Sequence, residues 1–117
     1  MRWQDIVEFA LRWPEVVEST SYGEPSLKVR KRLLTRTRLD DDSLVLLDVP
    51  AEEREMLIVA APRVFFVEEH YRDYDIVLAW LATLTRQDVE PLLERRWRNS
   101  ATKRAIARFD AERGGNQ

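Results

Sequence analysis

Three short runs of strand-forming residues follow one another in the first half of the chain, and their spacing restricts the fold more than any other feature. The runs cover residues 26–30, 33–39 and 43–49. Only two or three residues separate them, which are the lengths that join neighbouring strands as β-hairpins. Strands joined in this way run antiparallel. The sequence therefore predicts an antiparallel sheet around this segment.

Helical patterns precede and follow these runs. Apolar residues from Trp3 to Trp13 recur at the i, i+3, i+4, i+7 spacing of a helix. This helix is expected to end before Pro14, because the residue before a proline avoids the helical region. Pro50 suits the first position of a second helix, which should end near residue 60. Residues 64–67 and 76–84 are predicted strands, and residues 19–25 and 68–75 are predicted loops.

The last predicted helix begins at a capping box made by Thr85 and Asp88. Its apolar face extends to Trp97. Asn99 and Ser100 either break this helix or restart it, since the helical pattern resumes beyond them.

The predicted order is thus helix, three strands, helix, two strands, and one or two helices. Strands joined by hairpins with helices collected elsewhere indicate an α+β fold. We predict a two-layer sandwich of α-β(3)-α-β(2)-α order, with an antiparallel sheet and its helices on one face. Residues 1–113 are expected to form a single domain, and residues 114–117 a flexible tail.

The 117 residues suffice for one domain with a sizeable core, and 44% of them are hydrophobic. No stretch approaches the roughly 20 apolar residues of a membrane span. The first residues also lack the apolar core of a signal peptide. We therefore expect a cytoplasmic protein with no membrane partner.

Few residues of the kinds that carry catalysis are present. The chain has no cysteine, one histidine and three glycines, so the usual His/Cys zinc sites and glycine-rich phosphate loops cannot form. Asp40, Asp41 and Asp42 lack the spacing of a calcium loop and are interpreted as an acidic turn. We expect a protein that is not an enzyme and that holds neither a metal ion nor a cofactor.

Charge is unevenly distributed along a chain whose net charge is only −2. Residues 26–38 carry six basic side chains and no acidic one, whereas residues 40–55 carry seven acidic side chains and one arginine. Residues 95–113 are again mainly basic. The first basic segment supplies the candidate nucleic-acid contacts: Lys28, Arg30, Lys31, Arg36 and Arg38.

The face that these cations share depends on the register of their hairpin, because side chains alternate between the two faces of a strand. A turn with an odd number of residues places four of them on one open face: Lys28, Arg30, Arg36 and Arg38. A two-residue turn at residues 31–32 separates the first two from the last two. A shared face is either a solvated surface whose arginines pair with the acidic run that follows at residues 40–55 or a phosphate-binding surface.

Aromatic side chains occur in two polar loops. Tyr22 precedes Gly23, and the loop at residues 68–75 holds the lone histidine beside tyrosines. Rings with polar tips either stack on bases and line ligand pockets or close the end of a sheet with their hydroxyls bonded to the backbone. The candidate pocket residues are Tyr22, His70, Tyr71, Tyr74 and Lys103.

Three segments together resemble one known family. They are residues 20–29 (TSYGEPSLKV), residues 61–74 (APRVFFVEEHYRDY), and Trp97 followed by Lys103 and Arg104. In this order, over nearly the whole chain, they are similar to the MmcQ/YjbR proteins, small bacterial proteins of α-β(3)-α-β(2)-α arrangement. The resemblance implies a fold like that of a phage double-wing domain and of secretion chaperones. It also implies DNA binding through the sheet face of the basic hairpin.

The favoured hypothesis is a small, non-enzymatic bacterial domain that contacts the DNA backbone through this hairpin. The alternative is a protein-interaction module, a dimer that binds a partner segment on its sheet as secretion chaperones do. A third hypothesis is a small-ligand or catalytic pocket around Tyr22, His70, Tyr71 and Lys103. DNA and protein are the expected partner classes, and the chain is expected to be a monomer or a weak homodimer.

Overall fold

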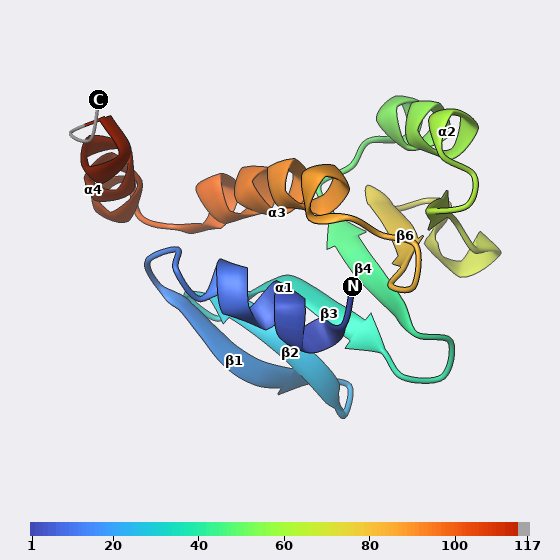
Figure 1. Ribbon diagram of the computed structural model, residues 1–117, viewed down its shortest axis with the longest axis horizontal. Helices are drawn as coiled ribbons and strands as arrows, with labels where there is room; N and C mark the ends of the chain where they lie inside the picture. Colours follow the sequence, from blue (N-terminus) through green and yellow to red (C-terminus); the bar gives the residue numbers. More distant parts are fainter. Residues whose placement is uncertain (115–117) are drawn as a thin grey trace.

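The computed structural model describes residues 1–114, which build a six-stranded antiparallel sheet and four α-helices (Figure 1). The strands stand in the order β1-β2-β3-β4-β6-β5 across the sheet. Every pair of neighbours is antiparallel. The predicted α+β class and antiparallel sheet are thereby confirmed.

Four consecutive strands come from the first half of the chain: β1 (Val16–Ser21), β2 (Glu24–Val29), β3 (Arg32–Arg38) and β4 (Ser43–Leu47). The sheet is completed by β5 (Phe65–Phe66) and β6 (Ile76–Trp80), with a 3₁₀ turn, η1 (Glu69–Tyr71), in the loop between them. The helices are α1 (Trp3–Ala10), α2 (Ala51–Ala60), α3 (Arg86–Ser100) and α4 (Lys103–Gly114).

The sheet has one strand more than the predicted five. The predicted loop at residues 19–25 is wrong, because only Tyr22 and Gly23 form a turn and the residues on either side pair in β1 and β2. Polar residues are tolerated in β1 because it is an edge strand whose side chains are mostly exposed. The predicted strand at residues 76–84 is shorter, ending at Trp80. Gly114 belongs to α4, and the rest of the predicted tail lies outside the described residues.

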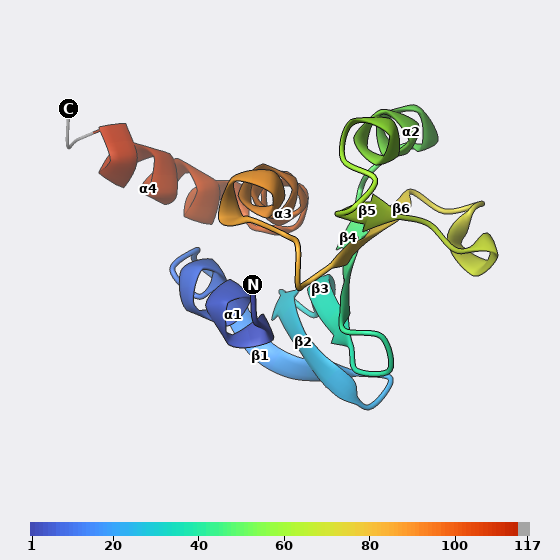
Figure 2. The same ribbon diagram turned by 45° about the vertical axis from the view of Figure 1, so that its right-hand side comes forward.

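Two helices, α1 and α3, cover one face of the sheet (Figure 2), and both bury apolar side chains. α1 buries Ile6 and Phe9, and α3 buries Leu93 and Trp97. The Trp97 ring stacks on Trp13, just beyond α1, with 6.0 Å between ring centroids. The spacing of these residues along each helix is the reason that one stripe can be fully buried.

The other two helices extend this layer. α2 lies beyond β5 and β6 at one end of the molecule, and Arg95 of α3 forms an ion pair with Glu53 of α2 at 3.0 Å. α4 begins after a short break at residues 101–102 and packs on α3 through Phe109, whose ring centroid is 5.0 Å from that of Trp97. None of the helices within residues 1–114 is long and apolar enough to cross a membrane.

Candidate functional site

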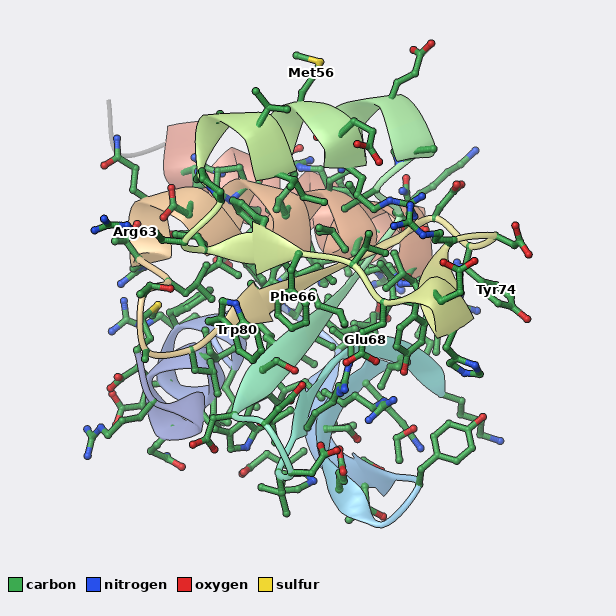
Figure 3. The ribbon with its side chains drawn as sticks, turned by 90° about the vertical axis from the view of Figure 1, so that its right-hand side faces the viewer. Met56, Arg63, Phe66, Glu68, Tyr74 and Trp80 are labelled. Atoms are coloured by element: carbon green, nitrogen blue, oxygen red, sulfur yellow. The ribbon has the colours of Figure 1, made fainter. Side chains whose placement is uncertain are left out.

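The face of the sheet opposite α1 and α3 carries no α-helix within the described residues, and we call it the helix-free face. Figure 3 looks onto it: Phe66 and Trp80 stack in front of the strands, with 3.9 Å between ring centroids. Tyr74 projects from the edge of the same view. Most of the predicted site residues lie on or beside this helix-free face.

A β-bulge decides which basic side chains reach this face. The turn between β2 and β3 consists of Arg30 and Lys31, one residue earlier than the two-residue turn that the sequence suggests. In a regular hairpin with this turn, Arg36 would point to the helix-covered face. The register shifts by one residue in the middle of the pair, and the bulge places Lys28, Arg36 and Arg38 together on the helix-free face. Arg30 leaves this face in the turn.

Arg36 and Arg38 are already engaged in ion pairs. Arg36 Nη1 donates to Glu24 Oε2 at 2.9 Å. Arg38 Nη2 lies 2.9 Å from Glu68 Oε1 and 3.0 Å from Asp41 Oδ2. Burial acts to lower the pKa of Arg38, but the hydrogen bond to Glu68 and the charge of Asp41 act against it, and the pKa stays above its ordinary value. These two predicted phosphate contacts therefore have little charge left for a partner.

Basic side chains without a carboxylate partner gather at one end of the molecule instead. Within residues 1–114 most of them lie at the β2–β3 turn, in the loop after α1 and at the start of α4, the exceptions being buried Arg54 and exposed Arg63. Nearly all of them are exposed. We call this surface the basic end, and it consists of Arg12, Lys28, Arg30, Lys31, Arg32, Lys103 and Arg104.

Backbone pairing and hydrogen bonds bring these segments together. β1 begins opposite the last residue of β2, so the loop after α1 runs beside the β2–β3 turn. Arg32 Nη1 donates at 2.9 Å to a backbone carbonyl near the end of α3. Glu15 accepts hydrogen bonds from the backbone and hydroxyl of Thr102 at 2.8 and 3.1 Å, which ties the start of α4 to the same loop. Arg12 and Arg104 line a groove of about 520 Å³ between that loop and α4.

The tip of the basic end has an unusual backbone. Arg30 and Lys31 have φ values of 52° and 73°, and positive φ at both positions of a two-residue hairpin turn is the mark of a type I′ turn. Such turns favour Asn and Gly, because a side chain with a Cβ costs roughly 1–2 kcal/mol in the left-handed region. The chain keeps two long cations here in spite of that cost.

An open hollow of about 550 Å³ lies on the helix-free face. Its floor is apolar and is made by side chains of β3, β4 and β6, namely Leu33, Val45, Leu47 and Ile76. Tyr22 from the β1–β2 turn and three residues from the β5–β6 loop, His70, Tyr71 and Tyr74, line the rest of it together with Arg36. We call this cavity the tyrosine hollow.

The structure brings together four of the five predicted pocket residues. Lys103 is not among them, because it begins α4 at the opposite end of the long axis from the β5–β6 loop (Figure 1). Sequence reasoning also missed Glu24 and Glu68, which neutralise the sheet arginines. Their partners are 12 and 30 residues away along the chain, and no local spacing connects them.

No family model, curated protein or solved structure matches this chain. The resemblance to the MmcQ/YjbR proteins therefore stays a prediction from the residues. What the site can do has to be argued from its charge and geometry.

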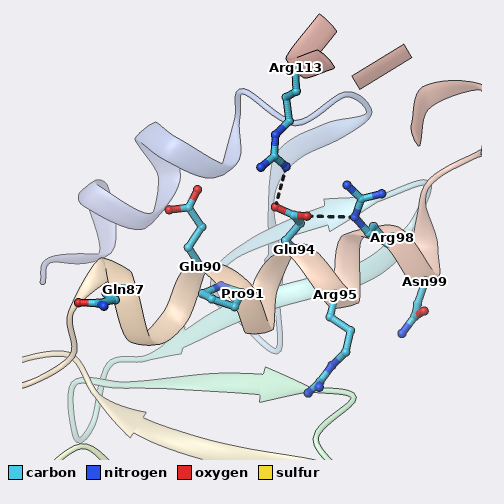
Figure 4. A pocket seen from close by; sticks show the side chains of 8 residues that line it. All are labelled: Gln87, Glu90, Pro91, Glu94, Arg95, Arg98, Asn99 and Arg113. Atoms are coloured by element: carbon cyan, nitrogen blue, oxygen red, sulfur yellow. Dashed lines mark hydrogen bonds and ion pairs between the residues drawn. The ribbon is translucent and has the colours of Figure 1, made fainter. Parts of the chain in front are cut away.

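A third cavity, of about 610 Å³, lies along α3 (Figure 4). Three of the charged residues that line it are paired with one another: Glu94 accepts a hydrogen bond from Arg98 at 3.0 Å and lies 3.4 Å from Arg113. Arg98 also binds Asp110 on α4. We interpret this cluster as the attachment of α4 to α3. Within residues 1–114, His, Asp and Glu residues form no group of three or more that could hold a metal ion.

Proposed function

We propose that this protein is a small, non-enzymatic domain that binds nucleic acid by contacting its phosphate backbone with the basic end. The same proposal makes it a bacterial protein of the MmcQ/YjbR type that works in the cytoplasm. The partner surface is shifted relative to the one expected from the sequence. The tip of the β2–β3 hairpin and the start of α4 bind the phosphates, rather than Arg36 and Arg38.

The observation that carries this proposal is the two-cation turn. Backbone strain at a surface turn gives the folded domain no benefit of its own, and such strain is typically retained at functional positions. Arg30 and Lys31 have no carboxylate partner within residues 1–114 and are exposed. Positive side chains of this kind neutralise phosphates and release the counterions condensed on nucleic acid.

The flanking residues make the tip part of a wider surface. Lys28 and Arg32 lie on either side of the turn, and Arg12, Lys103 and Arg104 extend the charge across the loop and α4. Of the nearby acids, Glu15 is occupied with Thr102 and Glu112 lies 3.5 Å from Arg108. Contacts to phosphate position a protein without reading sequence, so we expect binding that depends on salt and is weakly selective.

A duplex-binding titration tests the proposal. A labelled DNA duplex is titrated with the protein at about 50 and 200 mM salt, and anisotropy reports the affinity. We expect binding at low salt that weakens at least tenfold at the higher salt. The double variant Arg30→Asn/Lys31→Gly should bind several-fold more weakly at low salt, and because Asn-Gly is the preferred type I′ turn the variant should fold normally.

The matched control removes two exposed cations away from the basic end. Arg63 precedes β5 and has no carboxylate partner within residues 1–114, whereas Arg72, which follows η1 in the β5–β6 loop, pairs with Glu69 at 2.8 Å. The variant Arg63→Gln/Arg72→Gln has the same net charge as the turn variant and should bind like the parent protein. Equal losses in the two variants would mean that net charge, rather than the basic end, drives binding. No binding at low salt would reject the proposal outright.

A further inference from the structure

The tyrosine hollow is separate from the surface that would contact phosphates, yet the two adjoin. Lys28 of the basic end pairs with Leu33 in the β2–β3 register, and Leu33 forms part of the floor of the hollow. A strand of nucleic acid held by Lys28 and the turn beyond it would therefore pass the mouth of the cavity.

The hollow has the chemistry of a site for a flat, uncharged ring. Its floor is aliphatic, and its walls are the aromatic rings of Tyr22, Tyr71 and Tyr74. Its volume of about 550 Å³ falls in the range of small-molecule sites. Stacking on such rings depends on the π-face of the ligand and on little else.

Arg36 spans the hollow but brings no net charge to it. Its guanidinium donates to Glu24 at 2.9 Å and to the Tyr71 hydroxyl at 2.9 Å, and it lies 5.6 Å from the centroid of the Tyr22 ring. The ion pair with Glu24 cancels its charge, so the cavity offers little attraction to a phosphate group. The exposed acids of the β5–β6 loop, Asp73 and Asp75, disfavour phosphate on that wall as well.

Tyr22 adds an observation independent of the cavity. It occupies the first position of the β1–β2 turn with a φ of 53°, followed by Gly23 at 77°. A bulky aromatic residue is unfavourable at this position, and Tyr22 is 92% exposed, so burial does not explain the choice. Tyr74 on the far wall is 60% exposed. Two exposed aromatic residues from different turns thus line the same apolar floor.

We infer that the tyrosine hollow receives an unpaired nucleobase. The inference rests on the proposed function and deepens it, because it makes single-stranded nucleic acid the preferred ligand. In a duplex both faces of each base are already stacked, so a paired base cannot enter. The phosphates flanking the captured base lie on the side of Lys28 and the β2–β3 turn.

The test compares three labelled oligonucleotides of about 12 nucleotides: oligothymidylate, an abasic strand with the same phosphates, and a duplex. We expect the parent protein to bind oligothymidylate most tightly. Tyr22→Asn removes the ring while improving the turn residue, so folding is not at risk. It should weaken oligothymidylate binding roughly 5- to 150-fold, since stacking contributes about 1–3 kcal/mol per base, and leave binding to the other two ligands unchanged.

Two matched variants complete the test. Tyr22→Phe keeps the ring and should bind oligothymidylate like the parent protein. Val59→Ala, which shortens an exposed side chain on α2 away from the hollow, should also have no effect. If Tyr22→Asn binds oligothymidylate as tightly as the parent protein does, the inference is wrong.

The same titrations separate this inference from the proposed function. If Arg30→Asn/Lys31→Gly weakens binding to all three ligands and Tyr22→Asn weakens none, the phosphate surface stands and the base site is rejected. If only Tyr22→Asn has an effect, on oligothymidylate alone, the base site stands and the proposed phosphate surface is rejected.

Discussion

Arg54 is a buried cation, and it has no carboxylate partner in the described part of the chain. Only 3% of its surface is exposed. Its guanidinium donates to the backbone carbonyls of Tyr74 at 2.9 Å, Ile76 at 3.1 Å and Arg72 at 3.1 Å. A single side chain of α2 thus holds the loop that forms one wall of the tyrosine hollow, and we regard it as a positioning residue.

Replacing this residue should loosen that loop. Arg54→Met keeps much of the buried volume but leaves three carbonyls without their donor, and each unpaired buried acceptor costs about 1–3 kcal/mol before water reaches it. We expect a loss of about 2–4 kcal/mol in the free energy of unfolding, measured by urea titration. Amide exchange at residues 72–76 should rise more than in α3. Unchanged exchange there would contradict the role assigned to Arg54.

For the turn at Arg30 and Lys31 we predict a gain in stability on substitution, in contrast to the loss predicted for Arg54. Arg30→Asn/Lys31→Gly relieves the left-handed strain at two positions, and the added flexibility of glycine in the unfolded chain offsets part of the gain. We expect the free energy of unfolding to rise by about 1 kcal/mol. A variant that becomes more stable while losing nucleic-acid affinity would show that the turn is retained for binding. A loss of stability would indicate that the parent turn is not strained.

At the scale of elements, the bulge in β3 determines what the sheet displays. One extra residue in β3 turns Arg36 and Arg38 away from the helices, where their charges would otherwise enter the apolar core. It also allows the ion pairs with Glu24 and Glu68 to form. The apolar layer and the helix-free face are therefore both consequences of one irregularity in strand pairing.

At the same scale, an ion pair between Arg98 of α3 and Asp110 of α4 attaches the last helix. Hydrogen bonds from Arg98 hold the pKa of Asp110 below its ordinary value of 3.8, and the nearest of these bonds measures 2.6 Å. The same contacts raise the pKa of Arg98 above its ordinary value. A carboxyl whose pKa is lowered by folding stabilises the folded state above its unfolded pKa, and this contribution disappears as the pH falls through the folded pKa.

We therefore expect the docking of α4 to be constant from neutral pH down to about pH 5 and to weaken below pH 4. The measurement is amide exchange in α4 relative to α3, because the ratio removes any general effect of acid. Asp110→Asn should increase exchange in α4 at neutral pH and remove the additional increase in acid. An unchanged acid response in Asp110→Asn would assign the effect to another group.

At the scale of the whole molecule, ion pairs within the described residues cancel many charges in the middle and leave unpaired basic and acidic side chains toward opposite ends. The basic end lies near α4, whereas exposed acids of α2, Glu52 and Glu55, lie toward the opposite end of the long axis (Figure 1). Most arginines of the basic segment at residues 95–113 are paired, as Arg96 is with Asp48 at 3.1 Å. The unpaired side chains at the two ends of the molecule are therefore the ones that can attract a charged partner.

The salt dependence of binding should map this distribution. The slope of log affinity against log salt concentration reports the number of phosphates neutralised, at about −0.9 per contact on duplex DNA. Arg12→Gln and Arg104→Gln should each make the slope shallower by about one. Glu52→Gln, at the acidic end, should leave the slope unchanged. A slope insensitive to both arginine substitutions would remove the α4 side from the proposed surface.

The sequence alone predicts the features that depend on near neighbours along the chain. Hairpin spacing predicts the antiparallel sheet, and the Thr85 and Asp88 capping box predicts the start of α3, where both capping bonds are present. Loop composition also indicates Tyr22 and the β5–β6 loop as candidate pocket residues. These features follow from local backbone preference and side-chain period, which a linear pattern records directly.

Only the tertiary structure decides which charges remain available and which aromatic rings meet. The bulge, the sixth strand and the pairing of Arg36 with Glu24 depend on contacts between segments distant along the chain. Arg54 belongs to an acidic stretch of sequence, yet it is buried because it shares a helical stripe with Leu57 and Ile58. A side chain's charge is set by its residue type, but its availability is set by its three-dimensional neighbours. The basic end, and the apolar floor that joins the predicted aromatic residues into the tyrosine hollow, could therefore be recognised only after folding.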